Sequence, residues 1–237
     1  MIISKQLLSS TVAAFGVNLS DNQIELFDKY ARMLLEWNEK FNLTAIKEPD
    51  DIVIKHFADS LYILNSVRFS SGDRLIDVGT GAGFPGLPLL IAKNDLNVTF
   101  LDSTGKKLTF INAVLDELSL SGTTIIGRAE ELGQSTEHRE KYDYSTARAV
   151  SELKIGAELC LPLTKTGGTF IAMKGSKAAE EAKNAKNALK LLGGEIVATN
   201  SVDLSSAGER HVLLIKKISQ TPTKYPRNYS QITKHPL

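Results

Sequence analysis

The sequence of 237 residues contains a single cysteine, Cys160, within the apolar stretch ELCLPL. One cysteine excludes a disulfide within the chain, which is typical of a reducing compartment, so we expect a cytoplasmic location. We interpret Cys160 itself as a buried, unreactive thiol. The four histidines are scattered along the chain without the pairwise spacing of metal ligands, and no metal site is expected.

Long hydrophobic runs are also missing. The longest, residues 84–92, is interrupted by two prolines and a glycine, so no membrane-spanning helix and no membrane partner are expected. The first 17 residues contain one early lysine and a break of serine and threonine, which indicates a short amphipathic helix rather than a signal peptide. With 42% hydrophobic and 23% charged residues, the composition is typical of a globular protein with a substantial core.

The charge is small overall but unevenly distributed. The net charge is +1, yet residues 216–237 contain five basic side chains and no acid, while the rest of the chain carries 23 basic and 27 acidic side chains. A basic tail on a mildly acidic body favours an anionic partner such as a nucleic acid. A solvated tail that only aids solubility explains the charge equally well.

Helical periodicity dominates the first third of the chain. Ser20 and Gln23 form the pattern of a capping box, and apolar residues then recur at helical spacing as far as Trp37. A second periodic set runs from Ile54 to Leu64. These patterns predict a helical N-terminal extension over residues 1–68.

From residue 72 onward, short β-rich segments alternate with helical patterns. This alternation predicts an α/β fold, a doubly wound and mostly parallel sheet of seven strands over residues 69–218, followed by a basic tail over 219–237. Because no useful helix separates the last two strands, we expect them to form an antiparallel hairpin at the sheet edge. The predicted strands are RLIDVG, NVTFLD, TTIIGRAEEL, YDYSTARAV, GGTFIAMKG, GEIVATNSVDL and HVLLIKK.

The stretch LIDVGTGAGFPGLPL, residues 75–89, fits two ligand signatures. Read from Gly81 it matches the G-x-G-x-x-G of dinucleotide-binding folds, and read from Asp77 it is an acid followed by G-x-G-x-G. Asp102, at the end of the next strand, is placed to bind the ribose that both kinds of cofactor contain. Asp77 favours S-adenosylmethionine, because a carboxylate would repel a pyrophosphate but tolerates an ammonium and a sulfonium. Pro85 also removes a backbone donor that a pyrophosphate would need.

Several motifs, in order, resemble one family over nearly the whole chain: WNEKFNLTAI, HFADSL, DVGTGAGFPGLPL, GRAEE, TARAV and MKG. The sequence resembles the glucose-inhibited division protein B family, also called ribosomal RNA small-subunit methyltransferase G. The resemblance implies a Rossmann-like class I methyltransferase that transfers a methyl group from S-adenosylmethionine to N7 of a guanine in 16S ribosomal RNA. The expected partner is therefore 16S ribosomal RNA or the small ribosomal subunit, and a monomer is expected.

Site residues follow from the glycine pattern and from this resemblance. The resemblance implies that Gly79 and Phe84 line the cofactor pocket, that Ala129 and Glu130 flank the adenine, and that Arg148 reaches the site from the fourth strand. The complete set expected to bind the cofactor is Asp77, Gly79, Gly81, Gly83, Phe84, Asp102, Ser103, Ala129, Glu130 and Arg148. The tail departs from the family's usual pattern, which has a further basic residue after YPR and a glycine soon after; Asn228 and Tyr229 stand there instead.

The acceptor chemistry suits a site with little catalytic apparatus. Enzymes that methylate exocyclic amines typically have an Asn/Asp-Pro-Pro-aromatic loop after the fourth strand, where this sequence has TARAV. Enzymes that methylate pyrimidine carbons use a nucleophilic cysteine in a Pro-Cys turn, and Cys160 does not lie in such a turn. No catalytic residue is assigned, and Arg148 and Lys174 are positioning candidates because both follow apolar strands. The candidates for RNA contacts are Asn42, His56, Lys174, Arg210, Lys224 and Arg227.

Three other functions fit parts of the sequence. A methyltransferase of a small metabolite would keep the fold but have no use for the basic tail. A non-catalytic RNA-binding module would contain a vestigial pocket and would not bind S-adenosylmethionine. A nicotinamide-dependent enzyme would explain the glycines but not Asp77.

Overall fold

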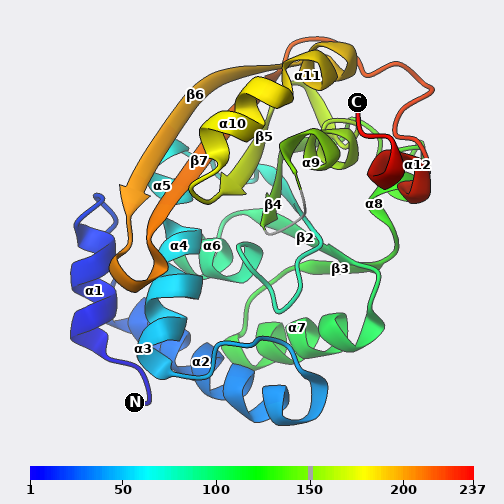
Figure 1. Cartoon of the computed structure of the whole chain (residues 1–237). Coiled ribbons are helices and arrows are strands. Elements are labelled where there is room, and N and C mark those ends of the chain that lie inside the picture. The colour runs from blue at the N-terminus through cyan, green and yellow to red at the C-terminus, as the bar shows by residue number, and fades with distance from the viewer. Residues whose placement is uncertain (149–151) are drawn as a thin grey trace.

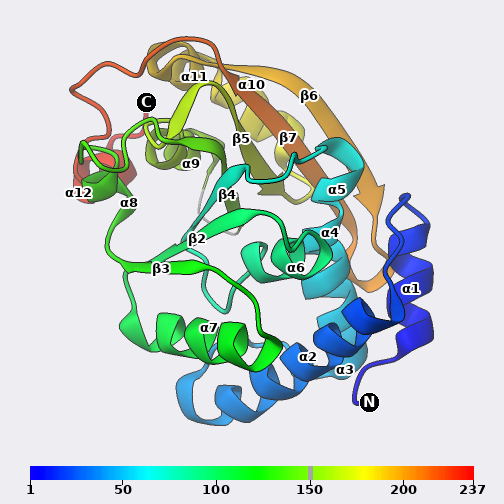
Figure 2. The same cartoon turned by 180° about the vertical axis from the view of Figure 1, so that it is seen from behind.

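The computed structural model describes residues 1–148 and 152–237. Its centre is a seven-stranded sheet in the order β3-β2-β1-β4-β5-β7-β6, with helices on both faces (Figures 1 and 2). The predicted α/β architecture, doubly wound and mostly parallel, is confirmed.

All seven predicted strands are present, but the third is shorter than predicted, because residues 129–132 of the segment TTIIGRAEEL form a helix. Strands β1 to β5 pair in parallel, whereas β7 lies between β5 and β6 and is antiparallel to both, so the predicted edge hairpin is confirmed. The last residues of the TARAV motif, Ala149 and Val150, lie outside the described residues. The strands are β1 Arg74–Val78, β2 Asn97–Asp102, β3 Thr123–Ile126, β4 Tyr142–Arg148, β5 Thr164–Lys174, β6 Gly194–Asp203 and β7 Glu209–Lys217.

The helices precede the sheet and connect its strands. The N-terminal ones are α1 Lys5–Ala13, α2 Asp21–Phe41, α3 Pro49–Ile52, the π-helical segment η1 Val53–Ala58, α4 Asp59–Leu61 and α5 Ile63–Ser66. The connecting ones are α6 Gly86–Ala92, α7 Gly105–Leu118, α8 Ala129–Leu132, α9 Leu153–Cys160, α10 Ala178–Asn184, α11 Lys186–Leu192 and the 3₁₀ turn η2 Ser205–Ala207. The chain ends with α12 Tyr229–Lys234.

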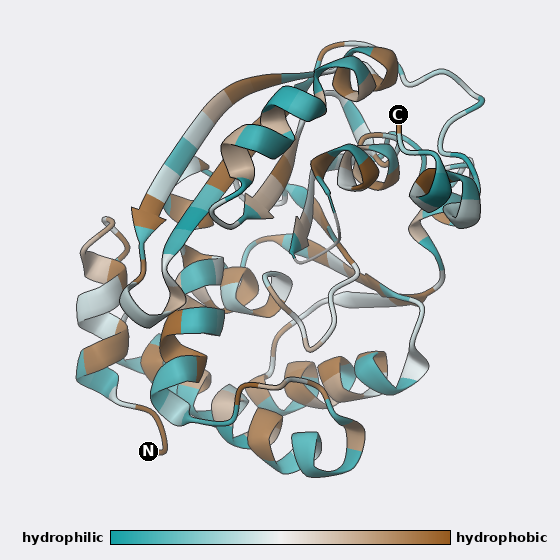
Figure 3. Ribbon diagram, viewed as in Figure 1, coloured by the Kyte–Doolittle hydropathy of each residue, from teal (hydrophilic) through white to brown (hydrophobic). Residues whose placement is uncertain are grey.

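The two faces of the sheet belong to two different cores. Residues that alternate along a strand point to opposite faces, so Leu75 packs with the N-terminal helices, α6 and α7, while its neighbour Ile76 packs with α8, α9 and the helices that follow. The helical N-terminal segment therefore shares its core with one face of the sheet. Figure 3 shows that α10, on the outside of the other face, is largely hydrophilic.

The predicted capping box at the start of α2 is present and also ties two helices together. The backbone N–H of Gln23 donates to Ser20 Oγ at 3.3 Å, and Ser20 N–H donates to Gln23 Oε1 at 2.9 Å. Gln23 Nε2 in turn donates to the carbonyls of Ile91 and Ala92, at the end of α6. Helix α2 is thus fixed against the helix that follows the glycine loop.

The basic tail is packed against the body of the protein. Ile232 of α12 is fully buried, and the Arg227 guanidinium binds the carboxylate of Glu158 in α9. Composition alone did not predict α12. Within residues 1–148 and 152–237, no helix combines the length and the apolar character needed to cross a bilayer.

Candidate cofactor and acceptor site

The glycine loop leaves the carboxyl end of β1 and enters α6. Gly79, Gly81 and Gly83 have φ values of 68°, 60° and 96°, a left-handed region that glycine adopts without steric cost. The loop is anchored to the next strand, because the N–H groups of Gly79 and Thr80 both donate to the carbonyl of Leu101. The loop therefore presents bare backbone beyond the ends of β1 and β2.

Asp77 lies beneath this loop. Its Oδ2 accepts hydrogen bonds from Thr80 Oγ1 at 2.7 Å and from Gly86 N–H at 2.9 Å, while Oδ1 is buried and finds no donor among the described residues. Burial raises the pKa of this carboxyl to about 6. Asp77 is therefore placed to hold the loop and the start of α6, and the described residues that line the neighbouring cavity do not include it.

A cavity of about 300 Å³ opens where β1, β2 and β3 end. Asp102 stands in its wall and also orders it, because its carboxylate accepts from Gly81 N–H at 3.0 Å and from Thr104 N–H at 2.9 Å. Of the residues expected to bind the cofactor, this cavity brings together Gly79, Asp102, Ser103, Ala129 and Glu130. Its lining residues that were not predicted include Leu159 of α9 and Tyr229 of the tail.

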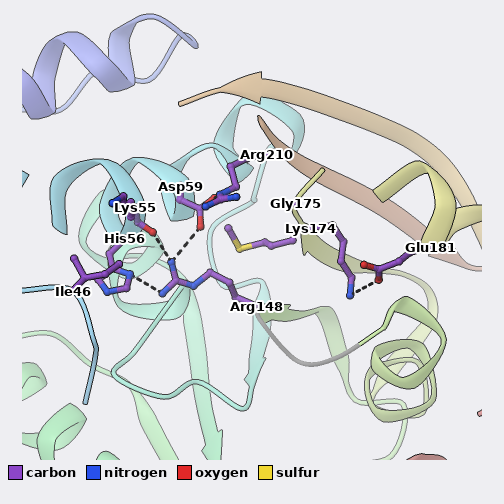
Figure 4. Close-up of a pocket in the computed structure, with 10 residues that line it drawn as sticks. Ile46, Lys55, His56, Asp59, Arg148, Lys174, Gly175, Glu181 and Arg210 are labelled. Atoms are coloured by element: carbon purple, nitrogen blue, oxygen red, sulfur yellow. Dashed lines mark hydrogen bonds and ion pairs between the residues drawn. The ribbon is translucent and has the colours of Figure 1, made fainter. Parts of the chain in front are cut away.

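A second cavity, of about 530 Å³, lies at the carboxyl ends of β4 and β5 (Figure 4). It brings together four of the predicted residues, Arg148, Lys174, Arg210 and His56. Two acidic residues accompany them: Glu181, 2.9 Å from Lys174 Nζ, and Asp59. Because β1 and β4 are neighbours in the sheet, this cavity lies beside the glycine loop.

Arg148 is held in place by the N-terminal extension. Nη1 donates to the carbonyl of Lys55 at 3.0 Å and to Asp59 Oδ2 at 3.2 Å, and Nη2 donates to His56 Nδ1 at 3.0 Å (Figure 4). Asp59 also lies 3.5 Å from Arg210 Nε. Burial raises the pKa of Asp59, and the two guanidinium groups oppose that shift. Asp59 lies in the HFADSL motif, but sequence reasoning did not select it.

His56 connects Arg148 to the segment between α2 and α3. A guanidinium can only donate, so Nδ1 of His56 is the acceptor, and the neutral ring then carries its proton on Nε2. Nε2 lies 2.9 Å from Thr44 Oγ1, which accepts the hydrogen bond from the Nε2–H group. Burial, followed by the charge of Arg148, lowers the pKa of His56 to about 3. His56 is therefore neutral near pH 7, with both nitrogens engaged.

Phe84 joins the extension to the glycine loop. Its ring stacks on His56, with centroids 4.3 Å apart, and on Tyr30 of α2, with centroids 5.4 Å apart. The hydroxyl of Tyr30 donates to the carbonyl of Ala82 inside the loop. Phe84 is buried in this stack, so the loop and the second cavity are held by the same N-terminal helices.

The other candidates for RNA contacts lie apart from both cavities. Asn42 is the left-handed C-cap of α2, with φ of 48°. Lys224 is exposed and lies over the ring of Tyr225. Arg227 donates from Nε and Nη2 to the two carboxylate oxygens of Glu158, at 2.8 and 2.6 Å. Their roles in binding RNA stay predictions.

The first cavity suits the adenosine half of S-adenosylmethionine. The carboxylate of Asp102 accepts from two backbone N–H groups and from Lys107 Nζ, which leaves an oxygen lone pair for a ribose hydroxyl. Gly127 and Ala129 leave space for a flat base, and Leu159 supplies an apolar surface. The cations in the wall are matched by acids, Lys107 by Asp102 at 3.3 Å and Arg128 by Glu130 at 4.0 Å. A cationic sulfonium therefore meets no uncompensated positive charge from these two pairs.

Comparison with solved structures agrees with this architecture. A protein from Bacillus halodurans described as a methyltransferase superposes with a TM-score of 0.54 at 12% identity, over 68% of this chain and 100% of that one. The sheet order and the glycine loop after β1 are those of the class I methyltransferase fold.

The chain belongs to the GidB family, described as rRNA small subunit methyltransferase G, whose model matches residues 23–213. It is 46% identical to the ribosomal RNA small subunit methyltransferase G of Alkaliphilus oremlandii, over 98% of both chains. It is 47% identical to the protein of the same name from Acetivibrio thermocellus, over 98% of this chain and 96% of that one. The family expected from the motifs is confirmed.

Proposed function

We propose that the protein transfers the methyl group of S-adenosylmethionine to N7 of a guanine in 16S ribosomal RNA. The observation that carries this proposal is the pair of cavities on either side of the glycine loop. One contains groups for adenosine, and the other is lined by Arg148, Lys174 and Arg210. Membership of a family named for small-subunit ribosomal RNA methylation supports the choice of acceptor.

The cofactor would be held from two sides. Asp102 would accept from the ribose hydroxyls, and the backbone of Gly79 would lie beneath the methionine portion. When bound, the cofactor supplies a methyl group already activated by the positive sulfur. The protein has to orient this methyl group and the acceptor and exclude water, and such orientation lowers a barrier by roughly 7–11 kcal/mol.

The second cavity, which we call the acceptor cavity, suits a nucleophile that needs no deprotonation. The N7 lone pair of guanine is free at neutral pH, so a general base is unnecessary. His56 has both ring nitrogens engaged, and the Asp59 carboxylate is bound to two arginines. A thiolate mechanism for carbon methylation is not supported, because Cys160 is fully buried in α9 and burial raises the pKa of its thiol.

The cations of the acceptor cavity would bind the RNA. Arginine and lysine bind the O6 edge of guanine as well as phosphates, so Arg210 and Lys174 could serve either purpose. Affinity that depends on neutralised phosphates falls steeply as salt concentration rises. We further propose a monomer that acts in the cytoplasm, where ribosomal subunits are assembled.

Transfer of labelled methyl groups tests this function. The wild-type protein, with labelled S-adenosylmethionine, is offered naked 16S ribosomal RNA, 30S particles and assembly intermediates. We expect label on at least one of them, at a guanine. Borohydride reduction followed by aniline should then cleave the RNA chain at that position, because N7 methylation makes the base sensitive to this treatment. Label on small metabolites alone, or on no ribosomal substrate despite cofactor binding, would contradict the proposal.

A matched pair of glycine variants serves as the control. Gly79→Asp places a carboxylate at a cavity-lining position with φ of 68°, and should abolish both binding and transfer. Gly167→Asp makes the same change at φ of 85°, where a Cβ meets nothing within 4 Å, and should leave transfer intact. If Gly79→Asp and Gly167→Asp bind S-adenosylmethionine and transfer methyl groups equally well, the first cavity is not the cofactor site.

A further inference from the structure

Tyr229 is the tail residue that lines the first cavity, at the ends of β1, β2 and β3, which we call the cofactor cavity. Tyr229 is the first residue of α12 and is 42% exposed. Leu159 lines the same cavity. We propose that Tyr229 is an aromatic wall for the adenine of S-adenosylmethionine and so a determinant of cofactor affinity. This inference rests on the proposed function, because it takes S-adenosylmethionine as the ligand.

The adenine, rather than the methionine end, is the group that this ring would meet. The other lining residues on this side come from the turn after β3, at Gly127 and Arg128, and from the start of α8, at Ala129. The acceptor cavity lies on the other side of the glycine loop, at the ends of β4 and β5. An aromatic ring stacks well on a purine, since both have polarisable faces.

A first anchor fixes Tyr229 from the side of α9. Arg227, two residues earlier, donates from its backbone N–H, Nε and Nη2 to the carboxylate of Glu158, at 3.0, 2.8 and 2.6 Å. Glu158 is fully buried and is the direct neighbour of Leu159, which lines the cavity. The same short helix therefore supplies part of the wall and holds the tail that supplies the rest.

A second anchor comes from the segment after α8. Gln134 Nε2 donates to the carbonyl of Pro226 at 2.9 Å, and Arg139 Nη1 donates to the carbonyl of Tyr225 at 2.8 Å. Gly133 lies so close to the tail that a Cβ there would be 2.8 Å from the Pro226 ring. The tail is thus held by both elements that frame the adenine side, so Tyr229 is positioned before the cofactor binds, which limits the ordering cost of binding.

Asn228 explains why the helix begins at Tyr229. Its side-chain oxygen accepts from Gln231 N–H at 3.0 Å, the contact of an N-cap. The cap and the aromatic ring are therefore consecutive residues, and the cap fixes the point at which Tyr229 enters the helix.

Calorimetry on the full chain tests the inference. Loss of one base–aromatic contact weakens binding by about tenfold, so Tyr229→Ala should raise the Kd for S-adenosylmethionine and for S-adenosylhomocysteine about tenfold each. Tyr229→Phe keeps the ring and should stay within about twofold of wild type. Ser230→Ala changes the next, exposed residue and should have no effect.

Kinetics separate this role from a role in RNA binding. For Tyr229→Ala, the KM for S-adenosylmethionine should rise while kcat at saturating cofactor and the KM for RNA stay near wild type. The inference is overturned if Tyr229→Ala binds the cofactor like wild type, or if only the KM for RNA changes. Wild-type binding and transfer in the same series report on the proposed function independently, since they can succeed while the Tyr229 variants show no effect.

Discussion

The guanidinium carbon of Arg148 lies 4.7 Å from the centre of the Phe84 ring. A cation at the end of β4 is thereby fixed above a side chain of the glycine loop, and the contact joins the two cavities of the site. Cation–aromatic contacts of this kind contribute about 0.5–2 kcal/mol. His56 takes part in both halves of the arrangement, because it stacks on Phe84 and accepts a hydrogen bond from Arg148.

Two substitutions at His56 separate these contributions. His56→Asn keeps an acceptor near the position of Nδ1, whereas His56→Phe keeps an aromatic ring but leaves Arg148 Nη2 without that acceptor. If the orientation of Arg148 matters more than the stacking, His56→Phe should lower kcat/KM by about a hundredfold and His56→Asn by about tenfold, since a misplaced group costs that much. Methyl-transfer kinetics measure both, and a greater loss in His56→Asn would reverse the assignment.

The stability of the protein should depend on pH through His56. Its folded pKa of about 3 is below the ordinary 6.5, so between these values the unfolded chain binds more protons. The contribution is fully present above pH 6.5 and is lost as pH falls toward 3, at up to about 1.4 kcal/mol per pH unit. Urea unfolding from pH 5 to 7 should therefore give a steeper rise in the free energy of unfolding for wild type than for His56→Asn. Equal slopes would show that His56 titrates normally.

Two glycines of the loop should differ in their tolerance of alanine. Both have positive φ, which costs an alanine about 1 kcal/mol. At Gly81 a Cβ has no neighbour nearer than 3.9 Å, whereas at Gly83 it would lie 2.8 Å from Leu87 Cγ and 3.0 Å from the Tyr30 hydroxyl. Overpacking adds roughly 1–3 kcal/mol, so Gly83→Ala should be the less stable variant by about that amount. Urea denaturation measures the difference, and equal stabilities would contradict the close packing of α6 and α2 around Gly83.

Two basic residues of the tail should also behave differently. Arg227→Gln removes the guanidinium from the buried Glu158 carboxylate, which keeps the hydrogen bond from the backbone N–H of residue 227, and should lower the free energy of unfolding by about 2 kcal/mol. Lys224→Gln changes an exposed side chain and should change stability by less than about 0.5 kcal/mol. Thermal unfolding and RNA-binding isotherms, recorded for both variants, distinguish stability from RNA affinity. Arg227 acts as an RNA contact instead if its variant stays stable and loses RNA affinity.

Local patterns were sufficient for most of the fold. Seven strand segments, the capping box of α2 and the hairpin at the edge could each be predicted, because strand alternation, helical spacing and cap chemistry act over a few residues. The glycine loop and Asp102 were also recognisable, since the loop and the end of β2 are short continuous segments. Tail helix α12 was not predicted, because the capping asparagine that starts it is followed by only six helical residues.

The sequence by itself determined the α/β alternation, the glycine loop and, through its ordered motifs, the family. Only the tertiary structure decided that Arg148 is held by His56 and Asp59, about 90 positions away along the chain. It also decided that Arg227 binds Glu158 and that Tyr229 lines the cofactor cavity. The physical reason is that charge pairing and cavity walls depend on which distant segments the sheet order and the two cores bring together, and local periodicity carries no information about those neighbours.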